Sequence, residues 1–234
     1  MDETNGTYAD MALAGIREMI LSGRLRPGQR VHQDHLSEKL GLSRTPLRTA
    51  LATLAKDGLL TYEANRGYRV RQFSIDTIRN VFEIRAVLEA QACTAAARAG
   101  LSAEVLDRLD ALVATGDAIL SVGRLDPDAL PAYRQMNVEF HDSIIAAARN
   151  PWLKEFVART HNVPMVSDRV ILWDRFEIIH RSHDDHRRIA AALRAGQGER
   201  AAALMHEHVT YAGDLLVARL EGDPDAAYRH MVPD

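Results

Sequence analysis

The sequence has little cysteine and no long apolar run. Its 234 residues include one cysteine, Cys93, which excludes an internal disulfide framework and is typical of the reducing cytoplasm. No apolar run approaches the length of a membrane span, and the opening residues MDETNGTYADM lack the pattern of a secretory signal. We therefore expect a soluble, cytoplasmic protein without a membrane segment.

A large excess of either charge is also missing, since the net charge is −3 at pH 7. The charges are nevertheless unevenly distributed. Residues 1–72 carry 11 Lys and Arg against 8 Asp and Glu, residues 24–71 carry 10 against 4, and residues 73–234 carry 18 against 24. A basic part followed by an acidic part is typical of a DNA-binding module joined to a sensing domain. Chance segregation of charges in an ordinary enzyme is the alternative cause.

The stretch from Leu36 to Leu60, LSEKLGLSRTPLRTALATLAKDGLL, predicts two short helices joined by a tight turn. Gly41 marks the end of the first helix, Ser43 is a favourable N-cap for the second, and Pro46 falls in its first turn. Four apolar residues then recur at helical spacing: Leu47, Ala50, Leu51 and Leu54. They give the second helix one buried face, as in a helix-turn-helix.

Three polar residues lie off that apolar face near the start of the second helix: Arg44, Thr45 and Arg48. Such a helix can enter the major groove of DNA end-first, where arginine grips guanine or phosphate. For any single arginine, a solvated surface charge is the alternative. The three together favour a recognition helix.

Two short strands should follow, over Leu59–Tyr62 and Tyr68–Arg71, with a turn between them. The turn carries Arg66 beside Gly67, and a glycine lets the backbone approach a phosphate or the minor groove. The pattern therefore predicts a β-hairpin wing with a basic tip.

From Ser74, a plausible N-cap, the pattern becomes helical and no strand pattern is visible. A first helix of the chain is expected at Tyr8–Ser22, after a disordered tail at Met1–Thr7. Further helices are expected at about Ile75–Ala99, Ser102–Val122, Leu130–Ala148, Pro151–Asn162, Pro164–Arg181, Ser182–Ala195 and Glu199–Glu221. The fold class is mainly α, with an N-terminal winged helix-turn-helix at 1–72, an antiparallel helix bundle at 75–222 and a tail at 223–234.

These motifs resemble a known family. The segments PGQRV, LSEKLGLSRTPLRTAL, LAKDGLL and NRGYRV are similar to the winged helix-turn-helix of GntR-family bacterial regulators. The segments FEIRAVLE, NVEFH, ARNPWL, DDHRRIAAALRAG and HEHV resemble the all-helical FCD effector domain of the FadR subfamily. The resemblance implies DNA contacts from Arg44, Thr45, Arg48, Arg66 and Gly67. Asp34 stands where that family often has a basic residue, so we expect no phosphate contact there.

Histidines in the second part predict a metal site. Asn137 and His141 are one helical turn apart, and His186 and His208 each share a face with apolar residues. Three inward histidines with an oxygen donor can bind a divalent metal such as Zn²⁺ or Ni²⁺. In FCD domains an aspartate usually stands at the position of Asn137, so the amide should weaken this site. The alternative is a hydrogen-bonded cluster of core histidines, satisfied by water or by an acid ligand.

Helical spacing also indicates whether other histidines and one arginine face the bundle interior or solvent. His206 should be solvated, whereas His180 and His183 could face either way. Arg85 lies on the apolar stripe of its helix, so its guanidinium should point into the bundle and needs an anionic partner. That partner is either an internal carboxylate or the carboxylate of an effector, and the resemblance favours the effector.

The resulting hypothesis is a transcription regulator and not an enzyme. It would bind a pseudo-palindromic operator in double-stranded DNA as a homodimer, and a small carboxylic acid in the bundle would change its DNA affinity. Two alternatives remain. A histidine-bound metal could activate water in a hydrolase, although no general base is evident. A metal could also merely hold together the bundle of a structural or interaction protein.

Overall fold

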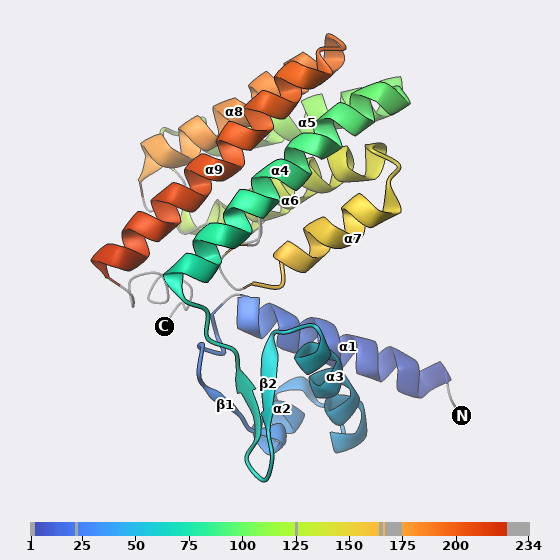
Figure 1. Cartoon of the computed structure of the whole chain (residues 1–234), viewed down its shortest axis with the longest axis vertical. Helices are drawn as coiled ribbons and strands as arrows, with labels where there is room; N and C mark the ends of the chain where they lie inside the picture. Colours follow the sequence, from blue (N-terminus) through green and yellow to red (C-terminus); the bar gives the residue numbers. More distant parts are fainter. Residues whose placement is uncertain (1–2, 22, 125, 164–165, 167–174, 224–234) are drawn as a thin grey trace.

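The computed structural model describes residues 3–21, 23–124, 126–163, 166 and 175–223, with side chains described from Tyr8. Figure 1 shows two parts stacked along the long axis. A small module of helices and a sheet lies at one end, and a bundle of long helices lies at the other. The fold is mainly α, as the sequence predicts, and no helix among the described residues is long and apolar enough to cross a membrane.

The small module is a winged helix. Its elements are α1 (Glu3–Leu21), β1 (Arg30–Val31), α2 (Gln33–Leu40), α3 (Arg44–Lys56), β2 (Leu60–Glu63) and β3 (Gly67–Val70). The strands form an antiparallel sheet in the order β1-β3-β2, in which Leu60 pairs with Val70 and Arg30 with Arg69. α1 begins five residues before the predicted Tyr8, so the expected disordered tail was wrong for the backbone from Glu3.

Local sequence explains why α3 stands where it does. Gly41 ends α2 with φ of 65°, in the left-handed region that glycine adopts without steric cost. Ser43 is the N-cap residue of α3, but its side chain makes no capping hydrogen bond. The four residues of the predicted apolar face are all at most 1% exposed: Leu47, Ala50, Leu51 and Leu54. Burying this face directs the opposite face of α3 to solvent.

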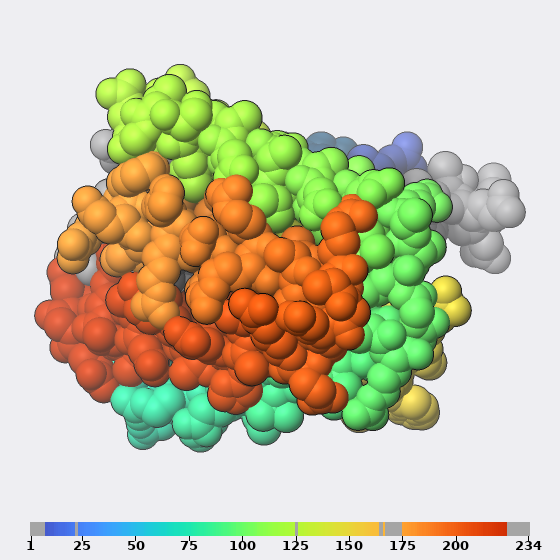
Figure 2. Space-filling model, turned by 90° about the horizontal axis from the view of Figure 1, so that it is seen from above, coloured from blue at the N-terminus to red at the C-terminus, as the bar shows by residue number. Residues whose placement is uncertain are grey.

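The bundle consists of long helices that lie roughly side by side. They are α4 (Ile75–Ala99), α5 (Ala103–Leu120), α6 (Leu130–Ala147), α7 (Pro151–Thr160), α8 (Phe176–Arg194) and α9 (Gly198–Gly222), with a 3-10 turn η1 at Pro127–Ala129. The Ser74 side chain caps α4 by accepting a hydrogen bond from the Thr77 amide at 3.1 Å, as predicted. Seen from above in Figure 2, α8 and α9 lie across one face, with α5 along one edge and α4 along the other.

One predicted helix boundary was wrong. The sequence predicts two helices, Pro164–Arg181 and Ser182–Ala195. In the structure α8 runs without a break through Arg181 and Ser182. Neither residue is a helix breaker, so the intrahelical hydrogen bonds continue through them. The start of the first of these helices, and the predicted tail after Asp223, lie outside the described residues.

Each part has its own apolar core. Buried residues between Ala12 and Val70 form one cluster, and buried residues between Ile78 and Leu220 form the other. In the second core, Gly213 of α9 lies against Phe82 of α4, where an added Cβ would stand 2.7 Å from the ring. This close approach brings the two longest helices of the bundle together. The domain limits at 72 and 75 stay a prediction.

Candidate metal centre and nucleic-acid interface

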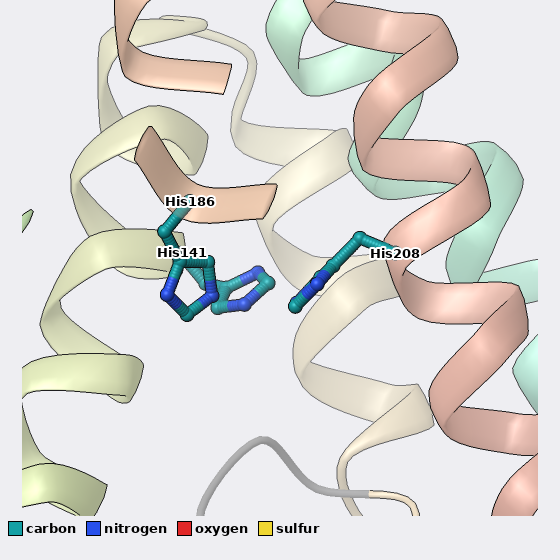
Figure 3. Close-up of side chains that lie close together, drawn as sticks. All are labelled: His141, His186 and His208. Carbon is teal, nitrogen blue, oxygen red and sulfur yellow. The ribbon is translucent and has the colours of Figure 1, made fainter. Parts of the chain in front are cut away.

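Three histidines from three helices converge inside the bundle. Figure 3 shows His141 of α6 and His186 of α8 facing His208 of α9. One ligand nitrogen from each lies within 4.8 Å of the other two. All three side chains are buried, with exposed fractions of 1%, 0% and 6%. This spacing is compatible with three imidazoles binding one metal ion.

The histidine nitrogens lack the hydrogen bonds expected of a satisfied core cluster. Both ring nitrogens of His186 and Nε2 of His141 are buried without a hydrogen-bond partner among the residues that the structure describes. Burial lowers the pKa of His186 well below its ordinary value and also lowers the pKa of His208. Both imidazoles are therefore held in the neutral form that binds metal. The donor set fits a divalent ion such as Zn²⁺ or Ni²⁺.

Two buried carboxylates lie beside the Nδ1 atoms of two of these histidines. Glu89 of α4, 1% exposed, lies 2.5 Å from Nδ1 of His141, which leaves Nε2 of that ring to face the site. Asp185 of α8, 2% exposed, lies 3.8 Å from Nδ1 of His208, beyond hydrogen-bond distance but close enough for attraction. A carboxylate at hydrogen-bond distance, as Glu89 is from His141, fixes the tautomer of a metal-binding imidazole and raises its basicity, whereas Asp185 acts on His208 only through its charge.

Each carboxylate is ionised despite its burial. Burial raises the pKa of Glu89, but Arg85 and His141 outweigh it and hold that pKa well below the usual value. For Asp185 burial acts in the same direction, and His208 and Arg188 again lower the pKa. The centre therefore places two imidazoles of lowered pKa, those of His186 and His208, next to buried negative charges.

Asn137, the predicted fourth ligand, lies one turn before His141 on α6 and is 8% exposed. The structure thus places the amide and the imidazole on the same buried side of the helix. An amide oxygen can bind Zn²⁺ or Ni²⁺, but it brings no negative charge. Its role as a ligand stays a prediction.

Arg85, the predicted effector residue, is buried and already has internal partners. Its Nε donates to Glu89 at 2.5 Å, and its Nη1 donates to the carbonyl of Val166 at 2.6 Å. The internal carboxylate that the sequence analysis considered as an alternative is therefore present. An effector contact at Arg85 would have to share the guanidinium with Glu89.

The remaining histidines have separate environments. His206 and His180 are exposed, as expected for His206. His183 is buried, and its Nε2 lies 2.9 Å from Asp117 and 3.1 Å from the carbonyl of Val113. It therefore belongs to a contact between α5 and α8, although its ring lies 5.9 Å from that of His186.

The predicted DNA-contacting residues of α3 lie on its exposed face. Arg44, Thr45 and Arg48 are all exposed at the start of the helix. Arg44 is not free in this structure, because its Nη2 lies 2.8 Å from Asp34 of α2. Both side chains are 75% exposed, so the pair can open readily. Asp34 thus competes for a guanidinium that the sequence analysis assigned to DNA.

The wing has the predicted hairpin form. Arg66 lies exposed at its tip, and Gly67 begins β3 with φ of 81°, a left-handed conformation that favours glycine. Arg30 of β1 holds the tip in place by donating to the Arg66 carbonyl from Nε at 3.1 Å and Nη2 at 2.7 Å. Because these hydrogen bonds use only the backbone carbonyl of Arg66, its side chain stays exposed at the tip.

Several residues of these sites were missed by sequence reasoning. Glu89 stands one helical turn after Arg85, and that spacing is a signal for an ion pair that was not used. Asp185 precedes His186 in the sequence but faces His208 from the neighbouring helix. Arg30 lies far from the wing in sequence, and only the sheet register brings it to the tip. No local pattern would have found these last two contacts.

The combination of a winged helix-turn-helix and an all-helical second part defines a class of bacterial DNA-binding regulators. Family models match both parts: "Bacterial regulatory proteins, gntR family" over residues 9–70, and "FCD domain" over residues 80–211. The chain therefore belongs to the GntR family of bacterial regulatory proteins, in the group that carries an FCD domain. Proteins of this family regulate transcription by binding operator DNA and are not enzymes, so the hydrolase alternative is wrong.

Relatives cover most of the chain. It is 27% identical over 207 residues to the Nta operon transcriptional regulator of Aminobacter aminovorans, covering 87% of this chain and 92% of that protein. It is also 27% identical over 202 residues to the HTH-type transcriptional repressor GlaR of Escherichia coli, covering 83% and 89%. The solved structure of E. coli McbR/YncC has a TM-score of 0.75 at 19% identity, covering 92% of this chain and 98% of that one, and so shares the fold.

Proposed function

We propose that this regulator binds a pseudo-palindromic operator as a homodimer in the cytoplasm, and that a small carboxylic acid in the bundle changes its affinity for DNA. Arg44, Thr45 and Arg48 would contact bases or phosphates in the major groove. Arg66 and the backbone at Gly67 would contact the neighbouring phosphates or minor groove. Only an acid that binds two arrangements of the chain unequally can shift the equilibrium between them.

We propose further that the bundle holds a divalent metal, Zn²⁺ or Ni²⁺. Its ligands would be His141, His186 and His208, with the amide oxygen of Asn137 as a weaker fourth ligand. The observation that carries this proposal is His186, which lies beside two other histidines and whose two ring nitrogens are buried without a hydrogen-bond partner in the described part of the chain. Burying such nitrogens without any bond is costly, and a metal ion would satisfy one on each ring.

When bound, the metal would supply a positive charge with open coordination positions for the effector's carboxylate. Arg85 would orient the second polar group of the acid while it keeps its contact with Glu89. Glu89 and Asp185 would hold the rings of His141 and His208 toward the metal. In this arrangement the chain binds and orients the acid, and no chemical step is involved.

The test is a thermal melt of the full chain after removal of metal by a chelator. Ligands that bind only the folded state raise the midpoint, by an amount that grows with the logarithm of ligand concentration divided by Kd. We expect Zn²⁺ or Ni²⁺ to raise the midpoint by several degrees, and one class of mono-, di- or hydroxycarboxylic acid to raise it further only when metal is present. His208→Ala should lose the metal response, whereas His206→Ala, an exposed histidine on the same helix, should keep it.

Other outcomes would change the proposal. If an acid raises the midpoint equally with and without metal, Arg85 would be the residue that binds the acid. The histidines would then only line the pocket. A metal response without any response to acids, together with unchanged DNA affinity, would favour the second candidate, a metal that only holds the bundle together. That candidate is supported by the same three histidines, because they join α6, α8 and α9.

A further inference from the structure

Arg17 of α1 connects the two parts of the molecule. Its Nη2 lies 2.5 Å from the Asp57 carboxylate, and its Nη1 donates to the Asn162 side-chain oxygen at 2.5 Å. Asp57 is the C-cap residue of the recognition helix α3, whereas Asn162 follows α7 of the bundle. One guanidinium therefore contacts the end of the DNA-reading helix with one nitrogen and the effector domain with another.

The bundle side of this contact leads to the histidine centre. Asn162 directly follows His161, the C-cap residue of α7, whose Nε2 lies 3.8 Å from Glu89. Glu89 in turn contacts both Arg85 and His141. A change in the charge or position of Glu89 thus acts on the end of α7, and the end of α7 carries the side chain that Arg17 holds.

The boundary between the two parts has room for such movement. A cavity of about 180 Å³ lies there, lined by residues of α1, α6 and α7 that include Arg17, Lys154, His161 and Asn162. Close packing resists small displacements, whereas an open space at the boundary leaves room for them. Figure 1 shows α1 passing below α7 at this boundary.

We propose that Arg17 is the positioning residue that transmits the state of the histidine centre to the recognition helix, through Glu89, His161, Asn162 and Asp57. This inference rests on the proposed function, since it names how the effector site regulates DNA binding. If a ligand in the histidine centre shifted His141 and with it Glu89, the end of α7 would be displaced, and the contact of Arg17 with Asp57 would then weaken or strengthen. The last turn of α3 and the strand that follows respond.

The path is testable without a ligand by amide hydrogen exchange of the full chain. The reporters are the amides of Asp57, Gly58 and Leu59, which donate to carbonyls of the last turn of α3 at 2.8, 3.1 and 2.9 Å. Asn162→Ala, a change in the other part of the molecule, should speed their exchange by about fivefold, because Arg17 loses one of its two anchors. Gln135→Ala, which removes an exposed amide of α6, should leave these reporters unchanged.

A second comparison tests the connection to the histidine centre. His161→Gln should also speed exchange at the three reporters in the wild-type background, by about threefold. In an Arg17→Gln background the same change should have less than half that effect on the logarithm of the rate. Glu89→Gln should change the exchange rates of the three reporters in the same direction, with the same dependence on Arg17. If Glu89→Gln does not fold, His161→Gln alone provides the test.

Reporter exchange that does not respond to Asn162→Ala, or that responds to His161→Gln equally with and without Arg17, would overturn the proposal. These outcomes are separate from the failure of the proposed function. Absence of any metal or acid response in the melts would remove the effector site but would not alter the exchange result. If the exchange results hold but the bundle binds neither metal nor acid, the path through Arg17 would still connect the two parts.

Discussion

At the scale of single residues, Asp34 decides how available Arg44 is to DNA. The carboxylate lies 2.8 Å from the guanidinium, and both are 75% exposed on the face that carries the recognition helix. A negative charge here also repels phosphate directly. If Arg44 contacts DNA as proposed, Asp34 should weaken that binding in two ways, by pairing with the Arg44 guanidinium and by repelling phosphate through its own charge.

Asp34→Asn should accordingly tighten operator binding by roughly three- to tenfold at low salt. The logarithm of the affinity should also fall more steeply with the logarithm of salt concentration, because Arg44 is then able to neutralise a phosphate. Fluorescence anisotropy with a labelled operator fragment, repeated over a range of salt concentrations, measures both quantities.

Glu38→Gln is the matched control, since it removes an exposed acid one turn further along α2. It should change the affinity less and should leave the salt slope almost unchanged. Equal effects of the two substitutions would contradict a specific role for the pair with Arg44. Loss of affinity in Asp34→Asn would indicate that the carboxylate itself contacts the operator.

Residue-scale contacts differ in whether the sequence can reveal them. The position of Glu89 one turn after Arg85 was available as a pattern, and the structure realises it as a 2.5 Å ion pair. The contact of Arg17 with Asn162 joins residues 145 positions apart, so no helical or strand spacing predicts it. Patterns within one element predict which side chains share a face, but not which side chain of another element they meet.

At the scale of elements, Asp117 joins α5 to α8. Its carboxylate accepts hydrogen bonds from Arg187 at 2.6 and 3.0 Å and lies 2.9 Å from Nε2 of the buried His183. Gly116 lets the ring of His183 lie against α5, because a Cβ there would stand 2.1 Å from it. The hydrogen bond of Arg187, assisted by His183, lowers the pKa of Asp117 although burial opposes this.

Asp117→Asn should therefore destabilise the bundle at neutral pH. The carboxyl group has a lower pKa in the folded chain than its ordinary value of 3.8, so its stabilising effect is present above that value and is lost as the pH falls through the folded-state pKa. Because the side chain is 40% exposed, we expect a cost of only about 0.5–1 kcal/mol, or roughly 2–4 °C in the melting temperature.

Melts recorded from pH 7 down to pH 3 test this dependence. The difference between wild type and Asp117→Asn should shrink as the wild-type carboxyl becomes protonated. Asp107→Asn removes a 72% exposed acid between the same two helices and should have a smaller effect at every pH. A difference that stays constant down to pH 3 would mean that the carboxylate's charge is not what stabilises the contact.

The elements themselves could be predicted well where a cap or a breaker marks their ends. Ser74 and Gly100 bound α4, and its limits coincide with the predicted ones. Where no such residue stands, the prediction was wrong, as at Arg181 and Ser182 inside α8. The start of α1 was also misplaced, because the polar residues before Tyr8 give no apolar periodicity from which a helix is recognised.

At the scale of the whole molecule, the proposal of a homodimer makes a prediction about mass and DNA. The free protein should sediment at twice the 26.0 kDa of the chain. Two copies should bind one operator duplex whose half-sites are related by a two-fold axis. Sedimentation velocity of the free protein, and titration of labelled operator at concentrations well above the dissociation constant, measure both.

A duplex with one half-site scrambled is the control for that titration. Its affinity should fall by about 100-fold or more, because one recognition helix then meets non-specific sequence. Binding of the scrambled duplex as tightly as the intact one would contradict reading by a symmetric pair. A free protein of 26.0 kDa that pairs only on DNA would place dimer formation on the operator instead.

The overall plan of two parts could be predicted because each part carries its own apolar pattern, and each has its own core. Spacing alone could place His141, His186 and His208 on inward helical faces, but it could not show that the three faces meet at one point. How the parts meet could not be predicted. The contact there depends on single side chains such as Arg17, which show no periodic pattern.

Asn137 has a consequence for the electrical neutrality of the centre. Each buried carboxylate already faces an arginine, Glu89 facing Arg85 at 2.5 Å and Asp185 facing Arg188 at 2.9 Å. A dication bound by three imidazoles and an amide would therefore bring two positive charges without counterions into a medium of low polarity. An aspartate at 137 would cancel one of them. With asparagine there, the acid that neutralises the centre most completely is one that carries two negative charges.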